Sequence, residues 1–171
     1  MEGTQRYAPS PGRPGRRNAA AAVAPSPLET VGVAANPEDA LAAATPELRV
    51  LLVEDSPLLV QRIGELVESV PRVRLAGIAG SETDALARLE AGDIDAVILD
   101  LQLHTGSGFG ILRALRRRCD GPQVVVFTNF AIGAYRDTAM ALGASHFLDK
   151  SRDYDRLAAV LGDLTRGLER H

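Results

Sequence analysis

Five short runs of aliphatic residues, with amphipathic stretches between them, constrain the fold of this chain more than any other feature. The runs are Leu48–Val53, Val73–Ile78, Ile94–Leu99, Gln123–Phe127 and Ser145–Leu148. Strands that are apolar at almost every position are buried on both faces, as in a parallel sheet that helices cover on its two sides. Five such strands alternating with five helices in ~120 residues predict a doubly wound α/β domain.

The helical stretches carry their own signals. One begins at Ser81, where Asp84 three residues later comes close to a capping box. In two others the apolar residues recur at the spacing of one helix face. These stripes are Leu59, Ile63, Leu66, Val67 and Val70 in the first helix, and Tyr154, Leu157, Leu161, Leu164 and Leu168 in the last. We therefore expect each of these helices to pack its apolar face against the sheet.

Residues 1–46 have a different composition. They hold seven of the ten prolines, and most of the remainder is Ala, Gly, Ser and Thr, without sustained apolar periodicity. Such a segment cannot bury enough apolar surface to offset its chain entropy. We therefore expect residues 1–46 to be a disordered tail and residues 47–171 to form a single folded domain.

Composition also argues against several functional classes. Nineteen Lys and Arg against twenty-two Asp and Glu give a net charge of −3, which argues against a nucleic-acid or anionic membrane surface. No apolar run approaches the ~20 residues that cross a bilayer. The one cysteine, Cys119, excludes a disulfide framework and favours the reducing cytoplasm.

Chemically active residues gather at the carboxyl ends of the predicted strands, which is where open parallel sheets bind ligands. Glu54 and Asp55 follow the first run, Asp100 ends the third, Thr128 the fourth and Lys150 the fifth. Three carboxylates held close together repel one another, so the site either raises the pKa of one of them or holds a cation, and oxygen ligands with room for water suit Mg²⁺. A strand-end aspartate can act as a nucleophile, while a lysine and a hydroxyl can bind phosphoryl oxygens. This edge of the sheet therefore predicts phosphoryl transfer to an aspartate.

The same segments resemble a response-regulator receiver domain. The resemblance rests on Val50–Pro57, Val97–Leu101, Val126–Thr128 and Phe147–Lys150, which follow one another in the family's order. It extends over roughly residues 48–169 and implies a five-stranded parallel sheet in the flavodoxin-like order 2-1-3-4-5, with helices on both faces.

Carried onto this sequence, the resemblance makes Asp100 the phosphoacceptor and Lys150 a contact of its phosphoryl group. Glu54 and Asp55 become the acid pair that holds Mg²⁺, directly or through water. The Asp100 carboxylate and the backbone carbonyl of Gln102 would complete the protein ligands of the metal.

In the same resemblance Thr128 is the switch hydroxyl and Phe147 the switch aromatic. Their movement would reshape the face made by the fourth helix, the fifth strand and the fifth helix, where an effector protein would bind. The phosphoryl donor would be a sensor histidine kinase or a phosphotransfer protein. Three residues follow the last predicted helix, so we expect a stand-alone regulator without a DNA-binding output domain. It would not be an enzyme, beyond promoting its own phosphorylation and dephosphorylation.

Four positions depart from the family's usual pattern. His104 and Ser151 stand where proline is usual, and Asn129 stands where a small residue is usual. We interpret His104 as a solvated loop residue. Phe130 replaces a common polar side chain, and because an apolar ring cannot orient an attacking water we expect slow self-dephosphorylation. The departures keep one alternative open, a phosphate-independent receiver-like interaction module.

Two other classes with related architecture fit the residues less well. An FMN binder of the flavodoxin type needs a hydroxyl- and glycine-rich loop after the first strand, where this chain has Glu54 and Asp55. A phosphatase of the haloacid-dehalogenase type needs a second aspartate two residues after the nucleophile, where this chain has Gln102.

Overall fold

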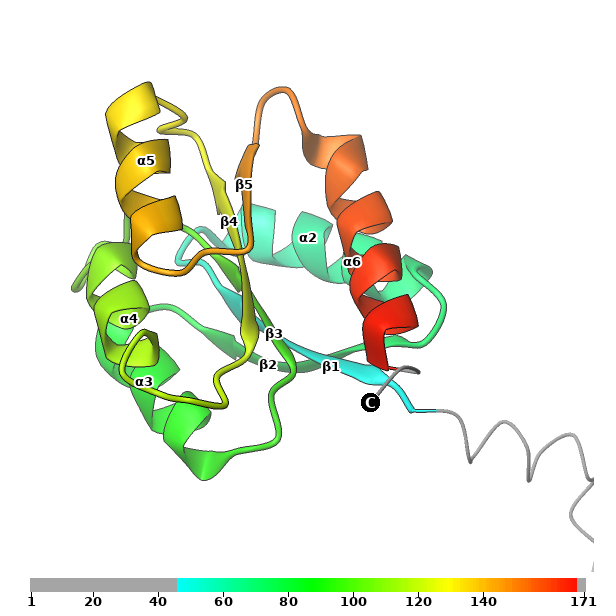
Figure 1. The fold of residues 1–171 in the computed structure, drawn as a ribbon. Coiled ribbons are helices and arrows are strands. Elements are labelled where there is room, and N and C mark those ends of the chain that lie inside the picture. The colour runs from blue at the N-terminus through cyan, green and yellow to red at the C-terminus, as the bar shows by residue number, and fades with distance from the viewer. Residues whose placement is uncertain (1–45, 169–171) are drawn as a thin grey trace, which may run out of the picture. The chain divides into compact units, whose positions relative to one another are not determined.

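The computed structural model describes residues 46–168 and shows strands and helices in alternation (Figure 1). The strands are β1 (Leu48–Val53), β2 (Val73–Ala79), β3 (Ala96–Leu99), β4 (Gln123–Thr128) and β5 (His146–Asp149). The helices are α2 (Pro57–Ser69), α3 (Glu82–Ala91), α4 (Gly108–Leu115), α5 (Gly133–Ala141) and α6 (Tyr154–Leu168). The predicted disordered tail, apart from Pro46, falls outside the described residues and stays a prediction.

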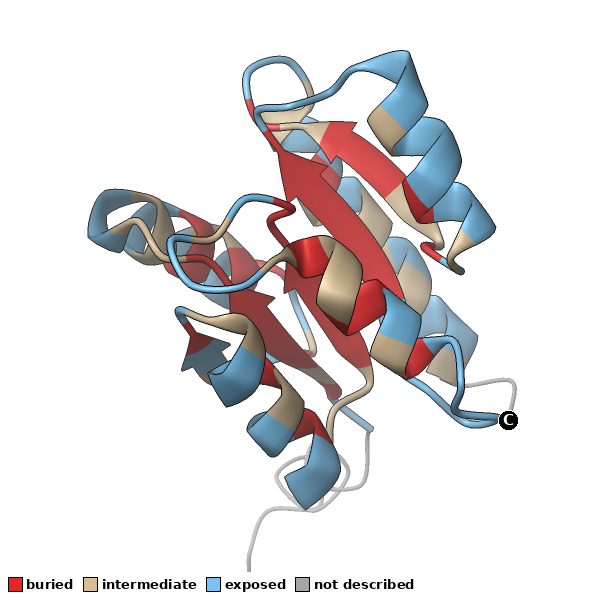
Figure 2. Ribbon diagram, turned by 90° about the vertical axis from the view of Figure 1, so that its left-hand side faces the viewer, coloured by how far each residue is buried: buried red, intermediate tan, exposed pale blue. Residues whose placement is uncertain are grey.

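The five strands are parallel and lie in the order β2-β1-β3-β4-β5, which confirms the predicted arrangement. Successive residues of β1 point to opposite faces of the sheet. Leu51 and Val53 pack on the side of α3, α4 and α5, whereas Val50 and Leu52 pack on the side of α2 and α6. Both faces are therefore covered by helices. β3 is buried at every position, and β1 at every position except Arg49 (Figure 2).

One strand differs from the prediction that every strand is buried on both faces. In β2 only the terminal residues Val73 and Ala79 are buried, while Arg74, Ala76 and Ile78 are exposed. The reason is position, because β2 forms an edge of the sheet next to β1. The aliphatic composition of the run did not distinguish an edge strand from a central one.

The predicted helix signals are present. Ser81 Oγ accepts a hydrogen bond from Asp84 N at 3.1 Å and so caps α3. In α6 the stripe buries Leu157 and Leu161, and the Tyr154 hydroxyl donates to the Arg62 carbonyl of α2 at 2.8 Å. Within residues 46–168 no helix combines the length and the apolar composition that a bilayer requires.

Both ends of the described chain lie at the amino-terminal edge of the sheet. Leu48, near the first described residue, and Leu168, the last one, line the same surface hollow together with Pro122 and Gln123 at the start of β4. The carboxyl ends of the strands lie at the opposite edge.

An ion pair between β1 and the start of β3 fixes the register of these central strands. Arg49 donates to Asp95 from its backbone N at 2.8 Å and from Nε and Nη2 at 3.0 and 3.1 Å. Burial disfavours the ionised form of Asp95, but these hydrogen bonds outweigh that effect and lower its pKa. A lowered pKa means that ionised Asp95 stabilises the fold above about pH 4, and that the stabilisation is lost as the pH falls through the pKa of the folded state.

The substitution Asp95→Asn is expected to lower the free energy of unfolding at pH 7 by about 2 kcal/mol, because it removes a charge-assisted two-pronged contact. The difference from the wild type should shrink as the pH falls below about 4, because Asp95 then takes up a proton in the unfolded state and, at still lower pH, in the folded state as well. Urea titrations at several pH values measure both effects.

Asp93→Asn is the matched control for this prediction. Asp93 also pairs with Arg49, at 2.8 Å, but its side chain is 87% exposed. Its loss should change the free energy of unfolding by less than about 0.5 kcal/mol. Equal effects of the two substitutions would contradict the role given to Asp95.

Candidate functional site

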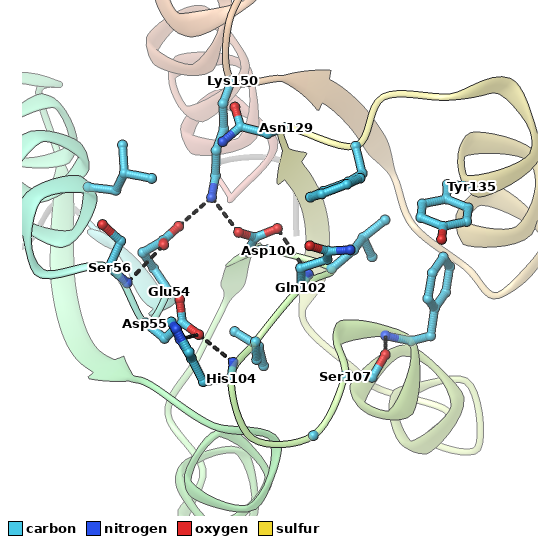
Figure 3. A pocket seen from close by; sticks show the side chains of 16 residues that line it. Glu54, Asp55, Ser56, Asp100, Gln102, His104, Ser107, Asn129, Tyr135 and Lys150 are labelled. Carbon is cyan, nitrogen blue, oxygen red and sulfur yellow. Dashed lines mark hydrogen bonds and ion pairs between the residues drawn. The ribbon is translucent and has the colours of Figure 1, made fainter.

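The strands β1, β3, β4 and β5 deliver chemically active residues to the same edge of the sheet, and an open pocket of about 580 Å³ lies there. We call it the rim pocket. Its lining includes Glu54, Asp55, Asp100, Gln102 and Lys150 (Figure 3). The structure thus brings together the residues predicted to hold the metal and the phosphoryl group.

The ammonium group of Lys150 links two of the carboxylates. Its Nζ donates to Glu54 Oε2 and to Asp100 Oδ2, at 2.5 Å each, and the three side chains are at most 10% exposed. The second oxygen of Glu54 accepts from Ser56 N, and that of Asp100 from Gln102 N, at 3.1 Å each. Two buried negative charges therefore share one buried positive charge, which leaves the rim pocket attractive to a further cation.

The third carboxylate, Asp55, is held by His104. Its Oδ2 accepts from His104 N at 2.5 Å and also contacts Nδ1 of the ring. Burial disfavours the ionised form of Asp55, but the hydrogen bonds from the backbone and the ring of His104 outweigh that effect, and the pKa of Asp55 is lowered. The ring is 87% exposed, as predicted for a loop histidine, yet it has a partner that the sequence did not reveal.

The loop between β3 and α4 is packed tightly against Asp100. A Cβ atom at Gly108 would lie 2.3 Å from the Asp100 carbonyl oxygen and 2.8 Å from Leu101 Cα. Only glycine fits there, and its N–H donates to the Leu101 carbonyl at 3.1 Å. This packing sets the path of the backbone through Gln102. The sequence analysis did not single out Gly108, although the alternation of Gly106, Gly108 and Gly110 is a visible signal.

The predicted switch residues, Thr128 and Phe147, are buried and are not part of the pocket's lining. Thr128 is fully buried, and its Oγ1 accepts from Phe130 N at 3.3 Å, which leaves the hydroxyl hydrogen available for donation. The lining instead contains Asn129 and Phe130, and Phe130 is 44% exposed. Phe147 is buried in the apolar cluster on the side of α3, α4 and α5.

An aromatic pair forms part of the lining of the rim pocket. Tyr135 of α5 meets Phe109 of α4 edge to face, with 5.5 Å between ring centroids and an interplanar angle of 88°. Figure 3 shows Tyr135 at the border of the pocket, away from the carboxylates. This contact joins the β3–α4 side of the pocket to α5.

The donor set of the rim pocket suits a hard divalent cation. The carboxylates of Asp55 and Asp100 line the pocket beside Gln102, and Mg²⁺ in proteins often takes one or two carboxylates and keeps several waters. In the part of the chain that the structure describes, no group of three or more His, Cys, Asp or Glu side chains is arranged to hold a metal by itself. Water or phosphoryl oxygens would therefore complete the coordination.

Comparison of the sequence with known protein families identifies a receiver-domain match over most of the folded region. Residues 50–162 match the family model described as the response regulator receiver domain. The matched segment contains every residue that lines the carboxylate side of the rim pocket.

Two curated relatives illustrate the similarity. The acid tolerance regulatory protein ActR of Rhizobium meliloti is 29% identical over 116 residues, which are 68% of this chain and 59% of ActR. A protein-glutamate methylesterase/protein-glutamine glutaminase of Symbiobacterium thermophilum is 35% identical over 104 residues, 60% of this chain and 29% of that enzyme. The chain therefore spans less than two thirds of the length of either relative.

Among solved structures, the response regulatory domain of mrkE from Klebsiella pneumoniae has the same fold. The two superpose with a TM-score of 0.65 and 24% sequence identity, over 72% of this chain and 99% of that domain. The agreement covers the folded part of the chain described above.

Lys150→Met is expected to lower the free energy of unfolding at pH 7 by about 3 kcal/mol, because it leaves Glu54 and Asp100 as uncompensated buried charges. Adding Asp100→Asn should recover part of that loss, since it removes one of the two charges. Denaturant titrations followed by circular dichroism measure the free energies of the three proteins.

The control for this prediction is Arg156→Met, which removes an exposed ion pair with Asp153 at 2.8 Å. It should change the free energy of unfolding by less than about 0.5 kcal/mol. A double variant no more stable than Lys150→Met would show that charge compensation is not what Lys150 provides.

Proposed function

The chain belongs to the response regulator receiver domain family, and from that premise we propose that Asp100 accepts a phosphoryl group from a sensor histidine kinase or a phosphotransfer protein. The observation that carries this proposal is the position of Asp100 at the end of β3, in an open pocket, with its carboxylate paired to the buried ammonium of Lys150. A phosphoryl group arriving there meets a nucleophile and a cation at the same point.

In the proposed step an oxygen of the Asp100 carboxylate attacks the phosphorus of a phosphohistidine. The new bond between oxygen and phosphorus forms as the phosphorus–nitrogen bond breaks, and the histidine nitrogen keeps the electron pair and takes up a proton. Lys150 would then pair with a phosphoryl oxygen while keeping its contact with Glu54, and the Thr128 hydroxyl would donate to another. No other covalent change in the protein is required.

The residues that would hold Mg²⁺ are Asp55, Asp100 and the backbone carbonyl of Gln102, with Glu54 acting through water. Support comes from the oxygen-rich lining and from the excess negative charge left by the sharing of Lys150. When bound, the cation neutralises negative charge on the transferring phosphoryl group. Glu54 is the less direct ligand in this proposal because its side chain is only 2% exposed, against 10% for Asp100 and 15% for Asp55.

The output would be a change in binding to an effector protein. Thr128 and Phe147 would move together, and the face formed by α5, β5 and α6 would change with them. This face carries Tyr135 and Arg136 on α5 and Arg156 on α6. A cytoplasmic location, where the exposed thiol of Cys119 stays reduced, belongs to the same proposal.

One observation favours the alternative, a phosphate-independent interaction module. The carboxylate of Asp55 already has two contacts from His104, and a metal ion would have to share or displace them. The two functions differ in whether the rim pocket binds Mg²⁺ and a phosphoryl group at all.

Incubation with acetyl phosphate and Mg²⁺ is expected to add one phosphoryl group to the wild type and none to Asp100→Asn, because the amide is not a nucleophile. Intact-mass spectrometry detects the adduct, and omission of Mg²⁺ should prevent it. Asp137→Asn, a substitution of an exposed aspartate on α5, is the matched control and should be phosphorylated normally. A wild type that gains no adduct and binds neither Mg²⁺ nor beryllofluoride would favour the alternative.

Phe130→Glu is expected to shorten the half-life of the phosphorylated protein, because a carboxylate at the border of the rim pocket can orient an attacking water and the ring of Phe130 cannot. The decay of the adduct after removal of acetyl phosphate measures the half-life. Phe130→Leu keeps an apolar side chain and should decay as slowly as the wild type. Equal half-lives for the Glu variant and the wild type would overturn this explanation.

A further inference from the structure

Glu82, the first residue of α3, makes two contacts across to the loop between β3 and α4. Its backbone N donates to the Thr105 carbonyl at 3.2 Å. Its side-chain Oε2 accepts from Ser107 N at 2.8 Å. Ser107 is the N-cap residue of α4, so the carboxylate of Glu82 lies at the amino terminus of a neighbouring helix, where a negative charge is favourable.

Two glycines leave room for this side chain. A Cβ atom at Gly106 would lie 2.3 Å from Glu82 Cβ, and one at Gly110 would lie 1.9 Å from Glu82 Oε1. Gly106 also has a φ of +86°, which favours glycine for a second reason. Gly110 lies within α4, where glycine costs helix stability relative to alanine, so the close approach of Glu82 gives it a reason to be glycine.

The loop is thus held by carboxylates from two other parts of the chain. Asp55 binds His104 in its middle, and Glu82 binds Ser107 at its end. Figure 3 shows the loop running from Gln102 past His104 to Ser107 along the edge of the rim pocket. Its position decides where the carbonyl of Gln102 points relative to Asp100.

We propose that Glu82 is a positioning residue that holds the β3–α4 loop so that the Gln102 carbonyl and Asp55 can hold a divalent cation together. The inference rests on the proposed function, because it concerns the metal site of that function. Glu82 itself touches neither metal nor phosphoryl group. It acts through its hydrogen bonds with Ser107 and Thr105, and Gly106 and Gly110 leave the space that its side chain occupies.

The first test is the affinity for Mg²⁺ alone, measured by isothermal titration calorimetry. Glu82→Ala is expected to weaken binding by about tenfold, the usual effect of losing a residue that orients a ligand. Glu82→Gln should retain most of the affinity, because its amide oxygen can still accept from Ser107 N. The matched control is Asp84→Ala, in the same first turn of α3, whose side chain pairs with Arg88 on the surface and which should bind as the wild type does.

The second test is hydrogen exchange of single amides without metal. Gln102 N donates to Asp100, and His104 N to Asp55, so both report the position of the loop at a distance from Glu82. Both amides should exchange faster in Glu82→Ala than in the wild type, and Glu82→Gln should restore their protection. A merely local role for Glu82 would speed exchange at Ser107 alone.

A double-mutant cycle tests whether Gly110 is needed to leave room for the Glu82 side chain. Gly110→Ala should weaken Mg²⁺ binding in the wild type but not in Glu82→Ala, where the space is empty. Gly106→Ala should be harmful in both backgrounds because its φ is positive. If Gly110→Ala weakened Mg²⁺ binding equally in the two backgrounds, the proposal that Gly110 leaves room for the Glu82 side chain would be wrong.

The outcomes separate this proposal from the proposed function. Unchanged Mg²⁺ affinity in Glu82→Ala, with a wild type that binds Mg²⁺, overturns the positioning role and leaves the receiver function standing. A wild type that binds no Mg²⁺ overturns the metal site itself. In that case the exchange rates of Gln102 and His104 decide alone whether Glu82 positions the loop.

Discussion

The sharing of Lys150 between Glu54 and Asp100 is the interaction on which the rest of the site depends. It joins the residues after β5, β1 and β3 in one buried contact, although these residues are far apart in the sequence. A lysine at this depth is tolerated only with such partners, and two buried carboxylates are tolerated only with a cation between them. The sheet brings the three groups together, and the three groups in turn oblige the ends of the strands to stay in register. Fold and chemistry are therefore coupled at this point.

The parts of the structure that could be predicted are those that local pattern determines. The apolar runs predicted the parallel sheet, Ser81 and Asp84 predicted the start of α3, and the carboxyl ends of parallel strands necessarily share one edge. Glu54, Asp100 and Lys150 could be grouped for that last reason. The exposure of β2 could not be predicted, because an edge strand and a central strand can have the same composition.

Contacts made by loops escaped prediction because they depend on where the chain turns in space. His104 could be located in a loop after β3, but its contact with Asp55 requires the path of that loop. Glu82 was not singled out from the sequence, because it is one of two acidic residues in the first turn of α3 and its partner Ser107 lies 25 residues away. The only sign of this contact in the sequence is the close spacing of Gly106 and Gly110. The two glycines indicate a packed side chain only once Glu82 is known to lie opposite them.

The hollow at the amino-terminal edge of the sheet has a practical consequence for engineering. Leu48 and Leu168 both line it, and the rim pocket lies at the other edge. A fluorescent protein or an affinity tag joined next to either residue would therefore emerge on the side away from the carboxylates. Such fusions would leave the approach of a partner to Asp100 unobstructed, so that immobilised or labelled forms of the domain would suit measurements of that encounter.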